Sequence, residues 1–171
     1  MKITLYLAVS ANGLIGNAQN NPYWLSDEYK QGFMDICTRT QAVIMGRSTY
    51  DILAPDYLPL RDQGSLAVLT HNKTMRSDNT AVFFSDAGPA AVRDMLAERG
   101  HREAVIIGGA EIATAFMQAE LINEIILVVE PVVFGSGLAL FKQGEFEYKM
   151  SLTDVKKLND HTVQLHYSVA G

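Results

Sequence analysis

The stretch AVIIGGAEIATAFMQA, residues 104–119, passes from an apolar run through two glycines into a second apolar segment. The run at 104–107 predicts a buried strand, because strands of a covered parallel sheet read as short apolar runs. The glycines at 108–109 predict a turn, and a helix is expected from Ala110 to Ala119. Residues 42–53 follow the same order, with a strand at the start and a short helix at the end. This alternation predicts an α/β fold, a three-layer sandwich around a mostly parallel sheet.

The remaining chain continues the alternation. Further strands are expected at residues 2–9, 66–70, 81–84 and 124–130, and further helices from Ser26 to about Thr38 and from Asp86 to Arg99. Residues 10–25 and 54–65 are expected to be loops, because they are rich in Gly, Pro or Asn. Two antiparallel strands, about 147–158 and 161–169, are expected to form a hairpin at the carboxyl end.

Length and composition indicate a single domain, residues 1–171, with a formal net charge of -5. This charge gives no general attraction to nucleic acid or to anionic membranes. Cys37 is the only cysteine, so an internal disulfide and a cysteine-rich zinc site are excluded, and no metal site is expected. The apolar start, MKITLYLAV, is too short to span a bilayer and lacks a signal-peptide cleavage site. A cytoplasmic protein without nucleic-acid or membrane partners is expected.

The carboxyl ends of parallel strands predict the position of the ligand site. In covered parallel sheets, ligands bind in a crevice beyond those ends. The loops after residues 9, 45, 70, 107 and 130 are therefore expected to surround one cleft.

Three of these loops carry residues suited to phosphate groups. Gly46-Arg47-Ser48-Thr49 combines a glycine, a helix start, a guanidinium and two hydroxyls. The segment 70–76 brings His71, Lys73 and Arg76 together, which would suit the extra phosphate of NADPH. The paired glycines at 108–109 allow a pyrophosphate to approach the backbone. Each motif alone also fits an ordinary turn or a solvated loop, and the segment 130–137 is expected to be a structural loop.

In this order, the motifs resemble the dihydrofolate reductase-like superfamily. AVSANGLIG at 8–16 resembles its first strand and mobile loop, and VIMGRSTY at 43–50 resembles its cofactor-binding turn. VLTHN at 68–72 is similar to the segment that meets the adenosine phosphate. VIIGGAEI at 105–112 resembles the paired-glycine turn at the pyrophosphate, where the family has an unusual cis peptide. Residues 121–141 are closest to the riboflavin-biosynthesis reductase branch, the RibD C-terminal domain.

The resemblance implies a set of cofactor residues for NADPH. On the phosphate turns these are Gly46, Arg47, Ser48, Thr49, Thr70, His71, Gly108, Gly109, Ala110, Glu111 and Ile112. Near the nicotinamide it implies Ala8, Ile15 and Gly16. It also makes a homodimer an expectation, because dimers are common in the riboflavin branch.

The substrate end departs from the folate reductases. Asp27 and Glu28 lie near the position of the family's catalytic carboxylate, but neither aligns cleanly, and the two acids also fit helix-start charge. The family's supporting threonine is matched by Leu127. Trp24 is placed at the rim of the substrate pocket and Phe33 on its helix wall, where an aromatic ring could stack on a flat heterocycle.

The resulting expectation is an NADPH-dependent oxidoreductase that transfers hydride to a small planar heterocycle, pterin-like or pyrimidine-like, and not to dihydrofolate itself. Its candidate catalytic residues are Asp27 and Glu28. The alternative is a nucleotide-binding or sensing protein that keeps the cofactor cleft and has lost catalysis.

Overall fold

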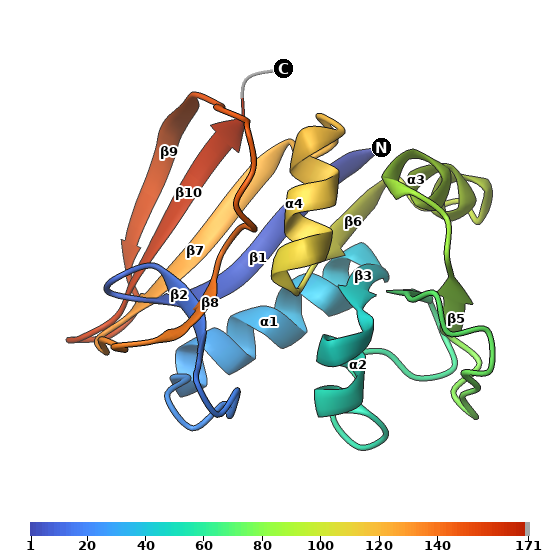
Figure 1. Cartoon of the computed structure of the whole chain (residues 1–171), viewed down its shortest axis with the longest axis horizontal. Helices are drawn as coiled ribbons and strands as arrows, with labels where there is room; N and C mark the ends of the chain where they lie inside the picture. Colours follow the sequence, from blue (N-terminus) through green and yellow to red (C-terminus); the bar gives the residue numbers. More distant parts are fainter. Residues whose placement is uncertain (170–171) are drawn as a thin grey trace.

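A computed structural model describes residues 1–169 and shows an eight-stranded sheet in the order β5-β4-β3-β6-β1-β7-β10-β9. Its parallel strands are β1 (Lys2–Ser10), β3 (Ala42–Gly46), β4 (Ser65–Leu69), β5 (Val82–Ser85), β6 (Glu103–Ile106) and β7 (Glu124–Glu130). The antiparallel pair is β9 (Met150–Lys157) and β10 (Val163–Val169). The expected mostly parallel sheet with a carboxyl-terminal hairpin is confirmed (Figure 1).

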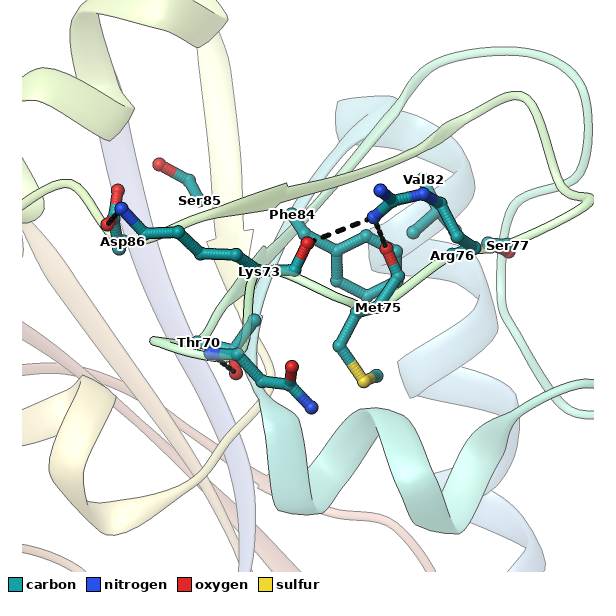
Figure 2. Close-up of a pocket in the computed structure, with 10 residues that line it drawn as sticks. Thr70, Lys73, Met75, Arg76, Ser77, Val82, Phe84, Ser85 and Asp86 are labelled. Atoms are coloured by element: carbon teal, nitrogen blue, oxygen red, sulfur yellow. Dashed lines mark hydrogen bonds and ion pairs between the residues drawn. The ribbon is translucent and has the colours of Figure 1, made fainter.

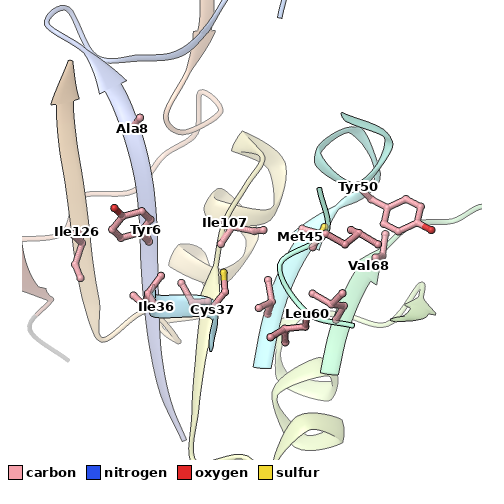
Figure 3. Close-up of a cluster of buried hydrophobic side chains, with 14 of the residues drawn as sticks. Tyr6, Ala8, Ile36, Cys37, Met45, Tyr50, Leu60, Val68, Ile107 and Ile126 are labelled. Carbon is pink, nitrogen blue, oxygen red and sulfur yellow. The ribbon is translucent and has the colours of Figure 1, made fainter. Parts of the chain in front are cut away.

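Four helices cover the two faces of the sheet, as in a three-layer sandwich. They are α1 (Asp27–Thr40), α2 (Arg47–Leu53), α3 (Pro89–Glu98) and α4 (Ala110–Gln118). Helices α1 and α2 share one apolar cluster with the sheet, which includes Tyr6, Cys37 and Tyr50 (Figure 3). Helices α3 and α4 share the other cluster, around Leu96 and Phe116. Burial of both faces explains why the central strands are apolar throughout.

A short strand lies within residues 10–25, which corrects the prediction of a loop there, whereas the loop expected at 130–137 is confirmed between the end of β7 and a second short strand. β2 (Leu14–Asn17) and β8 (Gly137–Ala139) pair with each other in a separate antiparallel sheet. A Cβ atom on Gly137 would clash with the carbonyl oxygen of Gly16, so this pairing requires glycine. The pairing joins the segment after β1 to the segment after β7.

Some element boundaries also differ from the expectation. Helix α3 begins at Pro89 and not at Asp86, because Gly88 is the N-cap and proline is favoured in the first turn. The Ser85 hydroxyl accepts a hydrogen bond from the backbone N–H of Ala87, which holds the preceding segment in a turn. The outer strand β9 begins at Met150, three residues after the expected 147.

Candidate functional site

The carboxyl ends of β4, β3, β6, β1 and β7 lie side by side along one edge of the sheet, as expected. At this carboxyl edge, the turns after β3 and β6 contact each other directly. The backbone N–H of Gly46 donates a 2.9 Å hydrogen bond to the carbonyl oxygen of Gly108. A Cβ on Gly46 would approach Ile112 Cγ1 to 3.0 Å. Gly46 and Gly108, which are 62 residues apart in the chain, therefore form one backbone surface.

The turn that leads into α4 has an unusual backbone. The Gly108–Gly109 peptide bond is cis, as the family resemblance led us to expect. Gly108 has φ +136°, and a Cβ there would lie 2.8 Å from the hydroxyl oxygen of Thr49. Gly109 is the N-cap of α4, and no side chain caps the helix. The first-turn N–H groups of a helix lack intrahelical partners, so this end of α4 offers donors to an anion.

A cavity of about 470 Å³ opens beyond the ends of β4 and β5 (Figure 2). Its lining residues are Thr70, Asn72, Lys73, Met75, Arg76, Ser77, Val82, Phe84, Ser85 and Asp86. The Lys73 ammonium lies 3.4 Å from the Asp86 carboxylate. The Arg76 guanidinium donates to the backbone carbonyls of Lys73 and Met75. The cavity thus combines two cations and three hydroxyl groups with an apolar floor.

Other side chains that were predicted to bind phosphate are not among the residues that line this cavity. Arg47 is exposed in the first turn of α2, where its Nε lies 3.2 Å from the Asp51 carboxylate. His71 is also exposed and is not among the cavity-lining residues. Ser48 is exposed, whereas Thr49 turns toward Gly108. The cofactor role of these side chains stays a prediction.

The residues predicted to lie near the nicotinamide are divided between β1 of the main sheet and β2 of the two-stranded sheet. Ala8 is buried within β1, beside Val128 of β7. Ile15 and Gly16 lie in β2 and not in a loop, and Gly16 pairs with Leu138 of β8. The two-stranded sheet therefore fixes the segment that the resemblance places over the nicotinamide.

Aromatic side chains line the amino-terminal part of α1. The Trp24 ring packs edge-on against Phe134, with ring centroids 5.3 Å apart. Phe33 lies 6.3 Å from Tyr29, and Tyr29 stacks on Tyr6 at 5.4 Å. Burial raises the pKa of both tyrosines, so both phenols remain protonated at neutral pH. These rings form an aromatic wall in which Trp24 and Phe33 are half-buried, and aromatic side chains suit contact with a planar ring.

The two acids predicted as catalytic lie outside this wall. Asp27 and Glu28 are both exposed in the first turn of α1. The Lys30 ammonium lies 2.9 Å from Asp27, and the hydrogen bond that it donates lowers the pKa of that carboxyl group. This setting is that of helix-start charge, and nothing in the geometry aims either side chain into a pocket. Their catalytic role stays a prediction without structural support.

Sequence reasoning missed the acid that is buried. Glu130, the last residue of β7, is 1% exposed. One oxygen accepts hydrogen bonds from the Ser26 backbone N–H at 3.0 Å and from the Ser26 hydroxyl at 2.7 Å. The other accepts from the Thr162 hydroxyl at 3.3 Å. Glu130 thus joins the N-cap of α1 to the end of β7 and to the turn between β9 and β10.

Within residues 1–169, the structure shows no cluster of three or more His, Cys, Asp or Glu side chains arranged to hold a metal ion. No helix in the same range is both long enough and apolar enough to cross a bilayer.

Comparison with known proteins gives a family match over nearly the whole chain. The model of the family described as RibD C-terminal domain matches residues 1–164. The uncharacterized protein YwjB of Bacillus subtilis is 34% identical over 172 aligned residues, covering 97% of each chain. Dihydrofolate reductase type 6 of Proteus mirabilis is 35% identical over 126 residues, covering 72% of this chain and 73% of the relative.

Solved structures show the same fold. A crystal structure of a putative riboflavin biosynthesis protein from Shewanella sp. PV-4 superposes with a TM-score of 0.84 at 21% identity and covers 100% of both chains. Dihydrofolate reductase from Enterococcus faecalis, complexed with NADP(H), superposes with a TM-score of 0.68 at 18% identity and covers 99% of this chain and 97% of that one.

Proposed function

The chain belongs to the RibD C-terminal domain family, and on that premise we propose that it is an NADPH-dependent reductase of a small planar heterocycle. One observation carries the cofactor half of the proposal. The turns after β3 and β6 are bonded through Gly46 and Gly108, beside the uncapped amino end of α4. Backbone donors at a helix start, with glycines that keep side chains away, suit a pyrophosphate.

The residues present fit NADPH at two of its anionic groups. The pyrophosphate would be held by backbone N–H groups from Gly109 to Ile112, because no side chain caps that end of α4 by a hydrogen bond. The adenosine phosphate would be held near Thr70, with Lys73 and Arg76 available from the neighbouring cavity. Arg47 would reach the same phosphate after releasing Asp51, since a guanidinium binds phosphate with two parallel donors.

When bound, NADPH supplies the hydride, and the protein contributes binding and orientation. Ala8 and Gly16 would border the nicotinamide, and a methyl group at Ala8 and the absence of a side chain at Gly16 leave room for a ring. Trp24 and Phe33 would border the substrate and hold it against the cofactor. Such positioning supplies much of the rate acceleration in hydride transfer, because the reacting atoms are already aligned.

The substrate class follows from the wall of α1. The rings of Trp24 and Phe33 favour a flat molecule, either a pterin or a pyrimidine. Dihydrofolate itself is disfavoured, because Asp27 and Glu28 point to solvent and Leu127 offers no hydroxyl group. A small heterocycle with its own polar groups would bind the main chain at the carboxyl edge.

Oxidation of NADPH at 340 nm tests the proposal, with pterins, pyrimidines, quinones and nitro compounds as a panel of acceptors. If the protein oxidises NADPH with one class of acceptor, and Gly108→Ala loses this activity, the result would support a reductase. Tight NADPH binding without oxidation by any acceptor would favour the sensing alternative. Absence of NADPH binding would contradict both the reductase proposal and the sensing alternative.

The same family premise leads us to propose a cytoplasmic homodimer. Cys37 is a buried free thiol, which suits a reducing compartment. The outer strand β9 leaves Met150, Leu152 and Val155 41%, 55% and 51% exposed, and this apolar strip would be covered by a second copy. Sedimentation equilibrium tests the dimer, and a monomer at micromolar concentration would contradict it.

A further inference from the structure

A lysine that the sequence analysis did not single out lies at the amino end of α4. The Lys142 ammonium is 3.1 Å from the carboxylate of Glu111, which is in the first turn of that helix. Lys142 follows β8 and is 28 residues from Thr114 along the chain, so tertiary contacts bring it to this position.

The main chain of Lys142 is fixed on α4 by a buried hydroxyl group. The Lys142 backbone N–H donates a 2.8 Å hydrogen bond to the Thr114 hydroxyl oxygen. That hydroxyl donates in turn to the carbonyl oxygen of Ala110 at 2.7 Å, and Thr114 is only 7% exposed. The adjacent Phe141 ring packs edge-on against Phe146, with ring centroids 5.9 Å apart. The backbone of Lys142 is therefore held beside the first turn of α4, and only its side chain is free to move.

The negative charge of Glu111 is unfavourable for an anionic ligand at this site. A carboxylate near a helix amino end stabilises the helix when no ligand is bound. Phosphate and carboxylate oxygens both act as acceptors, so the Glu111 side chain cannot donate to a pyrophosphate. Glu111 can serve the cofactor only through its backbone N–H, while its charge repels the ligand. A cation beside it is needed to offset this repulsion.

We propose that Lys142 is a cofactor-binding residue, which exchanges the Glu111 carboxylate for the pyrophosphate of the nicotinamide nucleotide. The inference rests on the proposed function, because it assigns a residue to that same cleft. Lys142 reaches the first turn of α4 from the segment after β8, and its side chain is 57% exposed, so its ammonium can leave Glu111 without being desolvated.

The same arrangement occurs at two other cations near the carboxyl edge. Arg47 is held by Asp51 and Lys73 by Asp86, at 3.2 and 3.4 Å. Arg47, Lys73 and Lys142 thus each have a carboxylate partner that a phosphate group could replace. When the anionic cofactor binds, these cations exchange their carboxylate partners for phosphate groups, and Lys142 binds the pyrophosphate.

The experiment measures the Kd of NADPH and of NADH by quenching of Trp24 fluorescence. Lys142→Met is expected to weaken both nucleotides by about two- to fivefold, the range of an exposed ion pair, because both carry the pyrophosphate. Glu111→Gln is expected to lower the Kd of both nucleotides by a similar factor. In the Glu111→Gln background, Lys142→Met should raise the Kd by a larger factor than it does in the unaltered protein. Added salt should shrink each difference. The matched control is Lys157→Met, which removes an exposed lysine paired with Asp160 on the β9–β10 hairpin.

Adenosine 2′-phosphate serves as a probe without a pyrophosphate, and its Kd should not change in Lys142→Met. Unchanged Kd values for both NADPH and NADH in Lys142→Met would overturn the inference while leaving the proposed function intact. An equal increase in the Kd of adenosine 2′-phosphate would also overturn the inference, since Lys142 would then act through the electrostatic potential of the whole cleft and not through the pyrophosphate. If the unaltered protein binds neither NADPH nor NADH, the proposed function fails together with the inference.

Discussion

The buried carboxylate of Glu130 leads to a quantitative prediction about stability. Its two oxygens accept hydrogen bonds from the Ser26 backbone N–H, the Ser26 hydroxyl and the Thr162 hydroxyl. Loss of a donor leaves a buried charged group with fewer partners, and such losses are expensive because water cannot replace them. We therefore expect Ser26→Ala and Thr162→Val to destabilise the fold, although neither side chain belongs to the apolar core.

The expected magnitudes follow from the geometry. The Ser26 hydroxyl lies 2.7 Å from Glu130 and also accepts from the Tyr29 backbone N–H at 3.2 Å as the N-cap of α1. A hydrogen bond to a charged group and an N-cap together contribute about 2–4 kcal/mol. The Thr162 hydroxyl is 3.3 Å from the carboxylate, at the long end of hydrogen-bond distances, so about 1 kcal/mol is expected for Thr162→Val.

Urea unfolding followed by circular dichroism measures both free energies of unfolding. Ser136→Ala is the matched control, because Ser136 is exposed in the loop after β7, and it should change the free energy by less than about 0.5 kcal/mol. The double variant should lose less than the sum of the single losses, since both donors serve one carboxylate. If Ser26→Ala loses no more than the control, Glu130 does not hold α1 in the way described.

Three further predictions concern single residues. Gly108→Ala should weaken NADPH binding by at least about tenfold in a fluorescence titration, because its Cβ would meet Thr49 at 2.8 Å and φ +136° is strained for alanine; an unchanged Kd would show that this turn does not serve the cofactor. Burial raises the pKa of the Cys37 thiol, so Ellman's reagent at pH 8 should react with it only in urea; rapid labelling of the folded protein would contradict this burial. Desolvation lowers the pKa of His101, whose ring nitrogen hydrogen-bonds with the Ser65 hydroxyl. The neutral imidazole therefore stabilises the fold fully above pH about 6.5, the unperturbed pKa of histidine. This stabilisation falls as the pH drops and is lost below the lowered pKa of the folded state. The free energy of unfolding of His101→Gln should therefore vary less between pH 7 and pH 5 than that of the unaltered protein, and parallel curves would refute this reading.

The sheet was predictable because its signals are local. The apolar runs at 42–45 and 104–107 are each followed by glycine and then by a helix that the sequence also predicts. Such strand–turn–helix units identify parallel strands without knowledge of their partners. The carboxyl edge then follows from the direction of the strands.

The short strands β2 and β8 were not predictable in this way. Each has four residues or fewer, and each pairs with a segment more than a hundred residues away. Their pairing depends on a close approach of Gly16 to Gly137, which has no signature in hydrophobic periodicity. Tertiary contact, and not local propensity, makes these strands.

The acids show the same limit at the candidate site. Asp27 and Glu28 attract attention because two carboxylates begin a helix, yet the structure leaves both in solvent. Glu130 ends the apolar run IILVV, and only its contacts with Ser26 and Thr162 distinguish it from an ordinary loop residue. The one signal in the sequence that could have identified Glu130 is that it is a charged residue at the end of a buried strand.

Calorimetric titration with NADPH tests the central claim most directly. We expect saturable binding of one nucleotide per chain, weaker binding of NADH, and loss of affinity in Gly108→Ala. Heats no larger than dilution for both NADPH and NADH at millimolar concentration would contradict it, because the bonded glycine turns and the uncapped end of α4 would then have no dinucleotide to hold.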